Sequence, residues 1–349
     1  MPRTTILEEE ALCGRSPAAP PSDDRRNPMK KIISIICGLM ILAACGDSDP
    51  RSLGANSVTL EPTVSVETEM PAQNQETVEP DESEVVQPSI DYPTAIVSLS
   101  PTATEMLFAI GAGPQVLAVD EYSYWPPEAP VVDGLSGWNP NVEAIATFEP
   151  DLVILSDNGI RQELELLGID VYVASAAIEL EDVWVQMLEI GEMTGQTDGA
   201  SSAVNDMKER ITAILSGIQR PETPITYYHE LDDTLYSVTS ETFIGKVYSL
   251  AGLTNIADPA DEDGTSWGYP QLGEEFVLQA DPDLIFFADA QCCGQSAETI
   301  SARPGWSELQ AVKNNNIFEI NSDISSRWGP RLVDFLEAVA RAVANVNEN

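Results

Sequence analysis

Two stretches of this chain repeat one another 132 residues apart, and this repeat constrains the fold more than any other feature. The first is NVEAIATFEPDLVIL at 141–155, and the second is GEEFVLQADPDLIFF at 273–287. In each, a Glu stands seven residues before a Pro-Asp-Leu sequence, and an apolar run follows. Because Glu143 matches Glu275 and Pro150 matches Pro282 at the same offset, the repeat predicts two halves that are built alike.

Apolar, β-branched runs alternate with helical segments on both sides of a helical zone. We expect strands at 94–100, 115–120, 151–156, 170–175, 224–231, 283–289 and 316–321. We expect helices at 101–112, over NVEAIATF, GIRQELELLG and FVLQA, and at 180–195, 198–218, 243–252 and 330–346. Strands that alternate with helices form parallel sheets. The pattern predicts an α/β lobe at 93–179, a helical linker with one long helix at 180–222, and a second α/β lobe with a closing helix at 223–349.

The N-terminal part has the pattern of an export signal. MKKIISIICGLMILAAC at 29–45 has two lysines, an apolar run and small residues before Cys45, as secretory signals have. Small residues followed directly by Cys resemble a bacterial lipoprotein signal, in which Cys45 carries the lipid. The apolar run is about 13 residues long, short of the roughly 20 that a membrane span needs. Residues 1–28 do not suit the start of a signal, so we interpret them as an upstream extension before the true initiator, Met29.

Residues 46–92 are acidic, rich in Pro, Ser and Thr, and nearly free of aromatic residues. Such a segment cannot bury enough apolar surface to fold. We therefore expect a disordered tether between a membrane anchor and the folded body, which places the protein on the outer face of the cytoplasmic membrane.

The overall charge and the cysteines narrow the possibilities further. With 57 acidic and 17 basic side chains, the protein repels nucleic acid and anionic lipid. Cys13 and Cys37 precede the expected cleavage point, so the folded body keeps only Cys292 and Cys293. In an exported protein these adjacent residues either form a disulfide in a tight turn that lines a site, or remain as two partly buried thiols.

No motif for catalysis is present. GAGPQV at 111–116 lacks the third Gly of a dinucleotide fingerprint and follows a helix, so we interpret it as a helix C-cap. The chain has one His, His229, which leaves no obvious general base and rules out a zinc or manganese site built from several imidazoles. We expect a binding protein without a metal cofactor of its own. The rivals are an enzyme with Cys292 and Cys293 as redox thiols, and a surface sensor or adhesion module.

Aromatic residues gather in loops that follow the expected strands. In α/β sheets, loops at the carboxyl ends of strands form the ligand crevice, and rigid rings there suit a large, flat, partly apolar ligand. The alternative is that some of these rings fill the lobe cores. The residues are Tyr122, Tyr124, Trp125, Trp138, Trp267, Tyr269 and Trp328.

Six segments together resemble the substrate-binding proteins of ABC importers for vitamin B12, ferric siderophores and haem. They are IVSLSPTATEMLFAIGAG, YSYWPPEA, NVEAIATFEPDLVI, TFIGKVYSLAGLTNI, PGWSELQAV and GPRLVDFLEAVA, spread over about 93–346. The resemblance implies two Rossmann-like lobes joined by a single long α-helix, little closure on binding, and a monomer that works with a permease dimer and its ATPase. It also implies that Glu143 and Glu275 dock on arginines of the two permease subunits. Alternatively, both carboxylates only cap helix N-termini.

Among these proteins the resemblance is strongest to the vitamin B12-binding members, which implies a corrinoid ligand held by Tyr122, Trp138, Tyr269, Asp323 and Arg327. We add Trp267 and Trp328 from the loop aromatics. The alternative ligands are a ferric siderophore, which calls for basic residues at the cleft, and haem, which calls for an axial His or Tyr. The candidates for those roles are Arg161, Arg303, Arg327, Arg331, His229 and Tyr228.

Two segments depart from the vitamin B12-binding pattern. DAQCCGQSAET at 289–299 has no counterpart there and follows an expected strand, so it borders the expected cleft. YYHELDD at 227–233 places charged residues where an aromatic contact is expected. These departures allow a variant corrinoid or another metal chelate.

Overall fold

The structure, a computed structural model, describes residues 91–348. The expected signal, Cys45 and nearly all of the tether lie outside the described residues. The described residues belong to one compact unit, and among them no helix combines the length and apolar character needed to cross a membrane.

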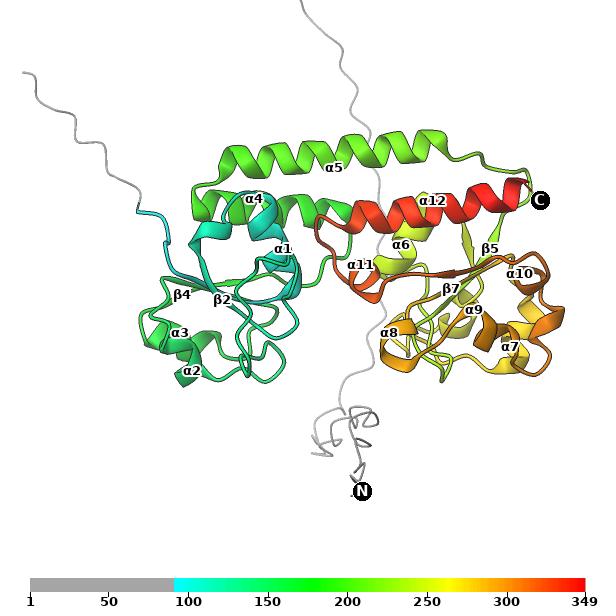
Figure 1. The fold of residues 1–349 in the computed structure, drawn as a ribbon, viewed down its shortest axis with the longest axis horizontal. Helices are drawn as coiled ribbons and strands as arrows, with labels where there is room; N and C mark the ends of the chain where they lie inside the picture. Colours follow the sequence, from blue (N-terminus) through cyan, green and yellow to red (C-terminus); the bar gives the residue numbers. More distant parts are fainter. Residues whose placement is uncertain (1–90, 349) are drawn as a thin grey trace, which may run out of the picture. The chain divides into compact units, whose positions relative to one another are not determined.

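Two parallel four-stranded sheets form the centres of two lobes (Figure 1). The strand orders are β2-β1-β3-β4 in lobe 1 and β6-β5-β7-β8 in lobe 2, so the two sheets have the same topology. In the central parallel pairs, Ile96 lies beside Leu152 in lobe 1 and Tyr227 lies beside Leu284 in lobe 2. The lobe 1 strands are β1 (Ile96–Leu99), β2 (Val116–Val119), β3 (Leu152–Leu155) and β4 (Asp170–Val173), and the lobe 2 strands are β5 (Thr226–Glu230), β6 (Thr254–Asn255), β7 (Leu284–Phe287) and β8 (Ile317–Glu319).

Short helices connect the strands within each lobe. In lobe 1 they are α1 (Pro101–Ala109), α2 (Val142–Ala146) and α3 (Arg161–Leu166), with a 3₁₀ turn at Gly113–Gln115. In lobe 2 they are α6 (Phe243–Leu250), α7 (Glu274–Ala280), α8 (Ala290–Cys293), α9 (Ala297–Ser301), α10 (Gln310–Lys313) and α11 (Ser322–Ser326), with 3₁₀ turns at Asp258–Asp261 and Trp306–Glu308. The predicted C-cap of α1 is confirmed, since Gly111 follows it with φ +94°.

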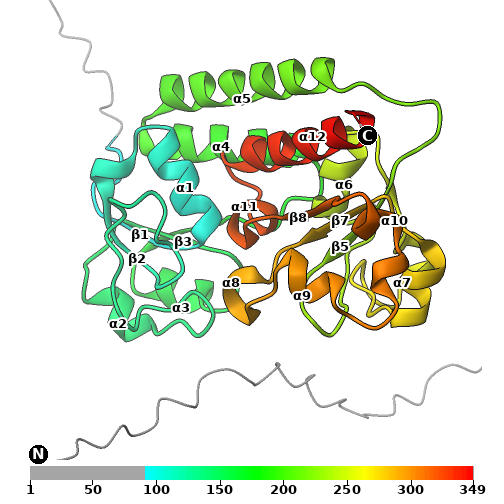
Figure 2. The ribbon, with the colours of Figure 1, turned by 45° about the vertical axis from the view of Figure 1, so that its right-hand side comes forward.

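Three longer helices form a layer that joins the lobes: α4 (Leu180–Thr194), α5 (Thr197–Gly217) and α12 (Leu332–Glu348). Figures 1 and 2 show α5 running from above lobe 1 to above lobe 2, alongside α12. Two glycines allow this close packing. A Cβ on Gly191 would lie 2.4 Å from the Cβ of Ala200, and one on Gly199 would lie 2.0 Å from the carbonyl oxygen of Ile110.

One hydrophobic core runs through both lobes and this helix layer. It includes Met106 of α1, Met187 of α4, Val204 of α5, Tyr248 of α6 and Phe335 of α12, all buried. Each sheet also has a smaller core of its own on its other face. Because a shared core ties the lobes together, the loops at the strand ends are held on a rigid frame.

Candidate functional site

The carboxyl ends of the lobe 1 strands open into a cavity of about 640 Å³, the lobe 1 cavity. β1 ends at Leu99, Asp120 directly follows β2, and Ser156 directly follows β3, so three neighbouring strands bring their loops together here. Two exposed rings line it, Trp138 at 85% exposure and Tyr122 at 57%. Since ligands of α/β proteins bind at this end of parallel strands, the lobe 1 cavity is a candidate site.

Gly137 and Asp120 determine where these two rings lie. A Cβ on Gly137 would lie 2.5 Å from the carbonyl oxygen of Leu99 and 2.8 Å from Oδ2 of Asp120, so only Gly lets the chain before Trp138 pass so close to the strand ends. Asp120 is 1% exposed, and its Oδ1 accepts the N–H of Tyr122 at 2.8 Å. Burial raises the pKa of the Asp120 carboxyl.

A second hollow of about 560 Å³, the lobe 2 cavity, is lined mainly by the segments that follow β5 and β6. Trp267, 88% exposed, and Tyr269, 44% exposed, line it together with Ala177 and Ile178, which follow β4 of lobe 1. The chain therefore contributes to this cavity from both halves. Four carboxylates line it as well: Glu241, Asp258, Asp261 and Glu262.

A buried ion cluster, the Glu105 cluster, connects lobe 1 to the segment between α11 and α12. Glu105 of α1 accepts hydrogen bonds from Arg327 at 2.8 Å and from Arg331 at 2.5 and 3.0 Å. The Glu105 side chain is 2% exposed, and those of Arg327 and Arg331 are 9% and 16% exposed. Three charge-assisted hydrogen bonds from two arginines to one buried carboxylate hold these segments together.

Arg327 and Arg331 have further contacts, with lobe 1 and with Asp323 of α11. Arg327 also donates to Asp323 at 2.8 Å and to the carbonyl oxygen of Tyr122 at 3.1 Å. The Tyr124 hydroxyl donates to Asp323 at 2.7 Å, and burial together with that carboxylate raises the pKa of Tyr124. Arg331 stacks on the ring of Trp125 at 4.7 Å. Tyr124 and Trp125 thus belong to the connection between the lobes.

The carboxyl end of the lobe 2 sheet holds a second buried pair. Glu230, at the end of β5, is fully buried and accepts two hydrogen bonds from Arg303 at 2.6 and 2.7 Å. Asp289, after β7, is also fully buried, and neither of its carboxyl oxygens has a hydrogen-bond partner among the described residues. Burial, with the nearby Glu230 carboxylate, raises the pKa of Asp289 to about 6.

His229 and Tyr228 are buried inside lobe 2, both at 0% exposure. The Nδ1 of His229 lies 2.7 Å from the hydroxyl of Tyr248, and burial lowers the His229 pKa to about 3. The Tyr228 hydroxyl donates to Glu230 at 3.2 Å. Neither side chain faces either cavity, so the expectation that one of them is available as an axial haem ligand does not fit the structure.

Cys292 and Cys293 form a disulfide in α8, and both residues are exposed. The structure therefore favours the disulfide over the partly buried thiols that the sequence also allowed. In both Figure 1 and Figure 2, α8 lies at the edge of lobe 2 nearest lobe 1.

Glu143 and Glu275 occupy matching positions on the two lobes. Each is the second residue of its helix, α2 or α7, and each is exposed. The cap of α2 is Asn141, whose side chain accepts the N–H of Ala144 at 3.0 Å. Neither glutamate side chain has a hydrogen bond or ion pair with the rest of residues 91–348. Their position in the first turn suits the helix dipole, but the capping role is not filled by Glu143.

The residues expected to bind the ligand thus fall into three groups, and Trp328 belongs to none of them. Tyr122 and Trp138 share the lobe 1 cavity, whereas Trp267 and Tyr269 share the lobe 2 cavity. Asp323 and Arg327 lie in the Glu105 cluster. Trp328, expected as a ligand-binding residue, is half-buried against the shared core, with its Nε1 3.4 Å from Gln186, and it lines neither the lobe 1 cavity nor the lobe 2 cavity.

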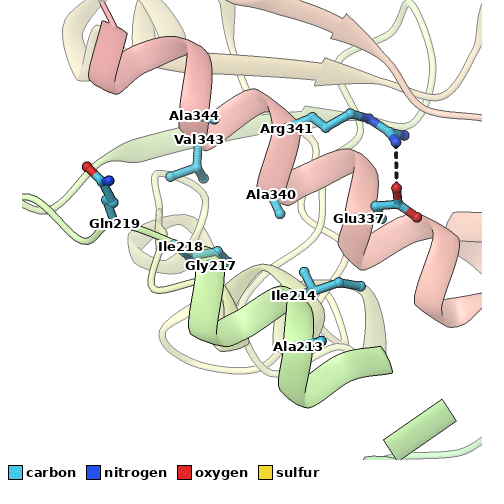
Figure 3. A pocket seen from close by; sticks show the side chains of 10 residues that line it. All are labelled: Ala213, Ile214, Gly217, Ile218, Gln219, Glu337, Ala340, Arg341, Val343 and Ala344. Atoms are coloured by element: carbon cyan, nitrogen blue, oxygen red, sulfur yellow. Dashed lines mark hydrogen bonds and ion pairs between the residues drawn. The ribbon is translucent and has the colours of Figure 1, made fainter. Parts of the chain in front are cut away.

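One further hollow lies away from the strand-end loops, and the described residues offer no metal site. A hollow of about 450 Å³ lies between the ends of α5 and α12, beside the Arg341–Glu337 pair (Figure 3), and no strand-end loop lines it. Within 91–348, no group of three His, Cys, Asp or Glu side chains is placed to hold a metal ion.

Residues 96–324 match the profile of a family described as periplasmic binding protein. The chain belongs to the periplasmic binding protein family. A cobalamin-binding protein of Halobacterium salinarum is 30% identical over 76% of this chain and 74% of its own length. An uncharacterized ABC transporter substrate-binding lipoprotein of Bacillus subtilis is 28% identical over 72% of this chain and 80% of its own.

Solved structures of family members share the fold. A vitamin B12-binding protein of Vibrio cholerae is 27% identical, with a TM-score of 0.60 over 74% of this chain and 99% of its own. A haem-binding protein of the same species is 23% identical, with a TM-score of 0.62 over 71% and 98%. The predicted fold class, two Rossmann-like lobes joined by a long helix, is confirmed.

Family membership fixes the general role. This protein is a substrate-binding protein of an ABC importer, in the group whose members include vitamin B12- and haem-binding proteins. It binds a small molecule and works with an ABC transporter. The family consists of transport proteins rather than enzymes, and it indicates an exported protein.

Proposed function

We propose that this protein captures a corrinoid between its two lobes and delivers it to an ABC permease. The ligand is held between the rings of Tyr122 and Trp138 in the lobe 1 cavity and those of Trp267 and Tyr269 in the lobe 2 cavity. A corrinoid suits such a site because its broad apolar faces stack on aromatic rings and its amide side chains donate hydrogen bonds. The cobalamin-binding relative supports the proposal.

The main observation in favour of a corrinoid over an anionic ligand is that the candidate arginines are already paired with carboxylates. Arg327 and Arg331 are bonded to Glu105, Arg303 to Glu230, and Arg161 to Glu165 at 2.7 Å. None of the basic residues considered for an anionic ligand is left without a carboxylate. To recruit Arg303, Arg327 or Arg331, an anionic chelate would have to break a buried ion pair, which is strongly destabilising. Only the pair of Arg161 with Glu165 is exposed.

The carboxylates of the lobe 2 cavity point to the same class of ligand. Glu241 and Glu262 can accept hydrogen bonds from a ligand, and together with Asp258 and Asp261 they repel anions. Neutral amide N–H groups fit this surface, whereas the carboxylates of haem or of many siderophores do not. Haem remains the second candidate because a solved haem-binding protein shares the fold, although His229 and Tyr228 are both buried away from the cavities.

Parallel tryptophan-fluorescence titrations of the purified protein test the ligand class. Cyanocobalamin and dicyanocobinamide should quench the exposed tryptophans saturably, while haemin and a ferric hydroxamate should not. Saturable quenching by haemin or the hydroxamate, with none by the corrinoids, would overturn the corrinoid proposal and leave the family assignment in place.

In this proposal the protein delivers its ligand by docking on the permease through Glu143 and Glu275. Glu143 and Glu275 are exposed, without intramolecular partners among the described residues, and placed at equivalent points of two equivalent lobes. A permease dimer presents two equivalent surfaces, so two matched acidic groups suit docking on basic residues of both subunits. The binding protein itself acts as a monomer, and the permease works with its own ATPase.

We further propose that lipid on Cys45 anchors the protein and that residues 46–92 tether the body, with lobes at 93–179 and 223–349 and a helical linker at 180–222. The lipoprotein relative supports the anchor. Changing Cys45 to Ser should release the protein from the membrane fraction. Retention of that variant in the membrane fraction would contradict a lipid anchor on Cys45.

A further inference from the structure

Trp267 adopts a backbone conformation that bulky residues avoid. Its φ is +56°, in the left-handed region that favours glycine. Its side chain is 88% exposed, so burial in a core does not compensate for the unfavourable backbone. Strained residues that persist without packing to justify them concentrate at ligand-binding and switch sites.

The carboxylate of Asp261 holds the backbone on both sides of Trp267. Oδ1 accepts the N–H of Ser266 at 2.7 Å, and Oδ2 accepts the N–H of Gly268 at 2.7 Å. The residues bonded are the immediate neighbours of Trp267 in the chain. One side chain therefore fixes the backbone from which the indole projects, through two charge-assisted hydrogen bonds.

The Trp267 loop, residues 261–269, is also joined to the body of lobe 2. The N–H of Thr239 donates to the carbonyl oxygen of Gly268 at 2.8 Å. Gly268 has φ +86°, and a Cβ there would lie 2.6 Å from Cγ2 of Thr242. Thr239, Thr242 and Trp267 all line the lobe 2 cavity. The loop thus presents the exposed indole from a fixed position beside the cavity.

We propose that Asp261 is a positioning residue that holds the indole of Trp267 in place beside the lobe 2 cavity, ready to stack on a flat ligand. This inference rests on the proposed function. Both carboxylate oxygens of Asp261 are engaged by backbone amides, so its role is exerted through Trp267. Fixing a side chain before the ligand arrives reduces the entropy lost on binding.

Fluorine NMR of the ligand-free protein tests the positioning directly. Protein labelled with 5-fluorotryptophan has six resonances, since the chain has six tryptophans, and Trp267→Phe identifies the one that belongs to Trp267. Asp261→Ala should shift that resonance, because the loop that carries the indole loses the two hydrogen bonds that fix its backbone. The resonance of Trp306, which is fully buried in lobe 2, should stay unchanged and reports that the variant folds.

Asp263→Ala is the matched control. Asp263 lies in the same loop, but it accepts only from Thr265, at 3.1 Å from its N–H and 2.8 Å from its hydroxyl. The Trp267 resonance should not move in this variant. An unchanged Trp267 resonance in Asp261→Ala, or an equal change in both variants, would overturn the proposal.

Binding of cyanocobalamin gives the second measurement. Asp261→Ala and Trp267→Ala should each weaken binding about tenfold, and the double variant should be no weaker than Trp267→Ala alone, because Asp261 acts through Trp267. Losses that multiply in the double variant would contradict the positioning role. If the wild-type protein does not bind cyanocobalamin, the proposed ligand is wrong, and the fluorine spectra of the ligand-free protein still decide the role of Asp261.

Discussion

The carboxylate of Asp151 accepts hydrogen bonds from both the N–H of Thr94, at 2.7 Å, and its hydroxyl, at 3.1 Å. At positions 132 residues further on, Asp283 accepts from the N–H and the hydroxyl of Thr226, at 2.8 and 2.9 Å. In each lobe the Asp of the repeated Pro-Asp-Leu sequence thus joins the beginnings of two neighbouring strands. The repeat has a structural part, the aspartates, and a separate exposed part, Glu143 and Glu275.

This relationship predicts that Asp283→Ala lowers the free energy of unfolding by about 1–3 kcal/mol, because the N–H and hydroxyl of Thr226 lose their charged acceptor. Chemical denaturation measures the change. Asp170→Ala is the control, since this exposed carboxylate accepts no hydrogen bond from the described residues. A free energy of unfolding equal to that of the wild type would show that the Asp283 contacts contribute nothing.

Reversing the charges of Glu143 and Glu275 should abolish uptake through the permease without changing the affinity for the ligand. The variant with Glu143→Arg and Glu275→Arg should take up no labelled cyanocobalamin in cells but bind it with unchanged affinity, because neither glutamate lines a cavity. Charge reversal at Glu163 and Glu274, which are also exposed and lie in the first turns of α3 and α7, is the matched control and should preserve uptake. Normal uptake by the Glu143/Glu275 variant would contradict docking through this pair.

Trp138→Ala should weaken corrinoid binding by roughly 1–3 kcal/mol, the scale of burying one large apolar side chain. The melting temperature should not fall, because the ring is 85% exposed and contributes little to the fold. Leu166→Ala is the control: this residue is 80% exposed on α3 and does not line the lobe 1 cavity. Unchanged affinity in Trp138→Ala would remove this ring from the site.

The pH dependence of stability should show that Asp289 has a raised pKa in the folded protein. Burial raises its pKa from 3.8 to about 6, so the folded state binds the proton more tightly than the unfolded state. The contribution of the protonated Asp289 carboxyl to the free energy of unfolding is complete below about pH 4 and is lost as pH rises through about 6. Asp289→Asn, which cannot ionise, should therefore be more stable than the wild type at pH 8 by roughly 1–3 kcal/mol.

At pH 4 the Asp289→Asn variant and the wild type should be nearly equal in stability, since the wild-type carboxyl is then protonated. Denaturation at both pH values measures the difference. A difference between variant and wild type that is the same at pH 4 and pH 8 would mean that Asp289 does not titrate with a raised pKa.

The regular elements could be predicted from the sequence because they follow local patterns. Each expected strand is present, and the long helix at 198–218 appears as α5, Thr197–Gly217. The two-residue strand β6 and the short helices α8 to α11 were not expected, since segments of this length carry no measurable periodicity.

The site was harder to predict because its contacts join distant residues. Exposure of Trp138 and Trp267 was expected from their loops, but their division between two cavities was not. Glu105 was missed altogether, although it is the only charged residue in the apolar helix PTATEMLFA. A lone charge among buried residues signals a buried partner. The partners, Arg327 and Arg331, lie more than 200 positions away, so only the fold could identify them.

Isothermal titration calorimetry of the purified protein with cyanocobalamin tests the central claim most directly. If one corrinoid lies between the lobes and contacts both cavities, the protein should bind a single equivalent, with a single transition. Two equivalents would mean that the cavities act as separate sites. No binding of cyanocobalamin under conditions where haemin binds stoichiometrically would contradict the corrinoid account altogether.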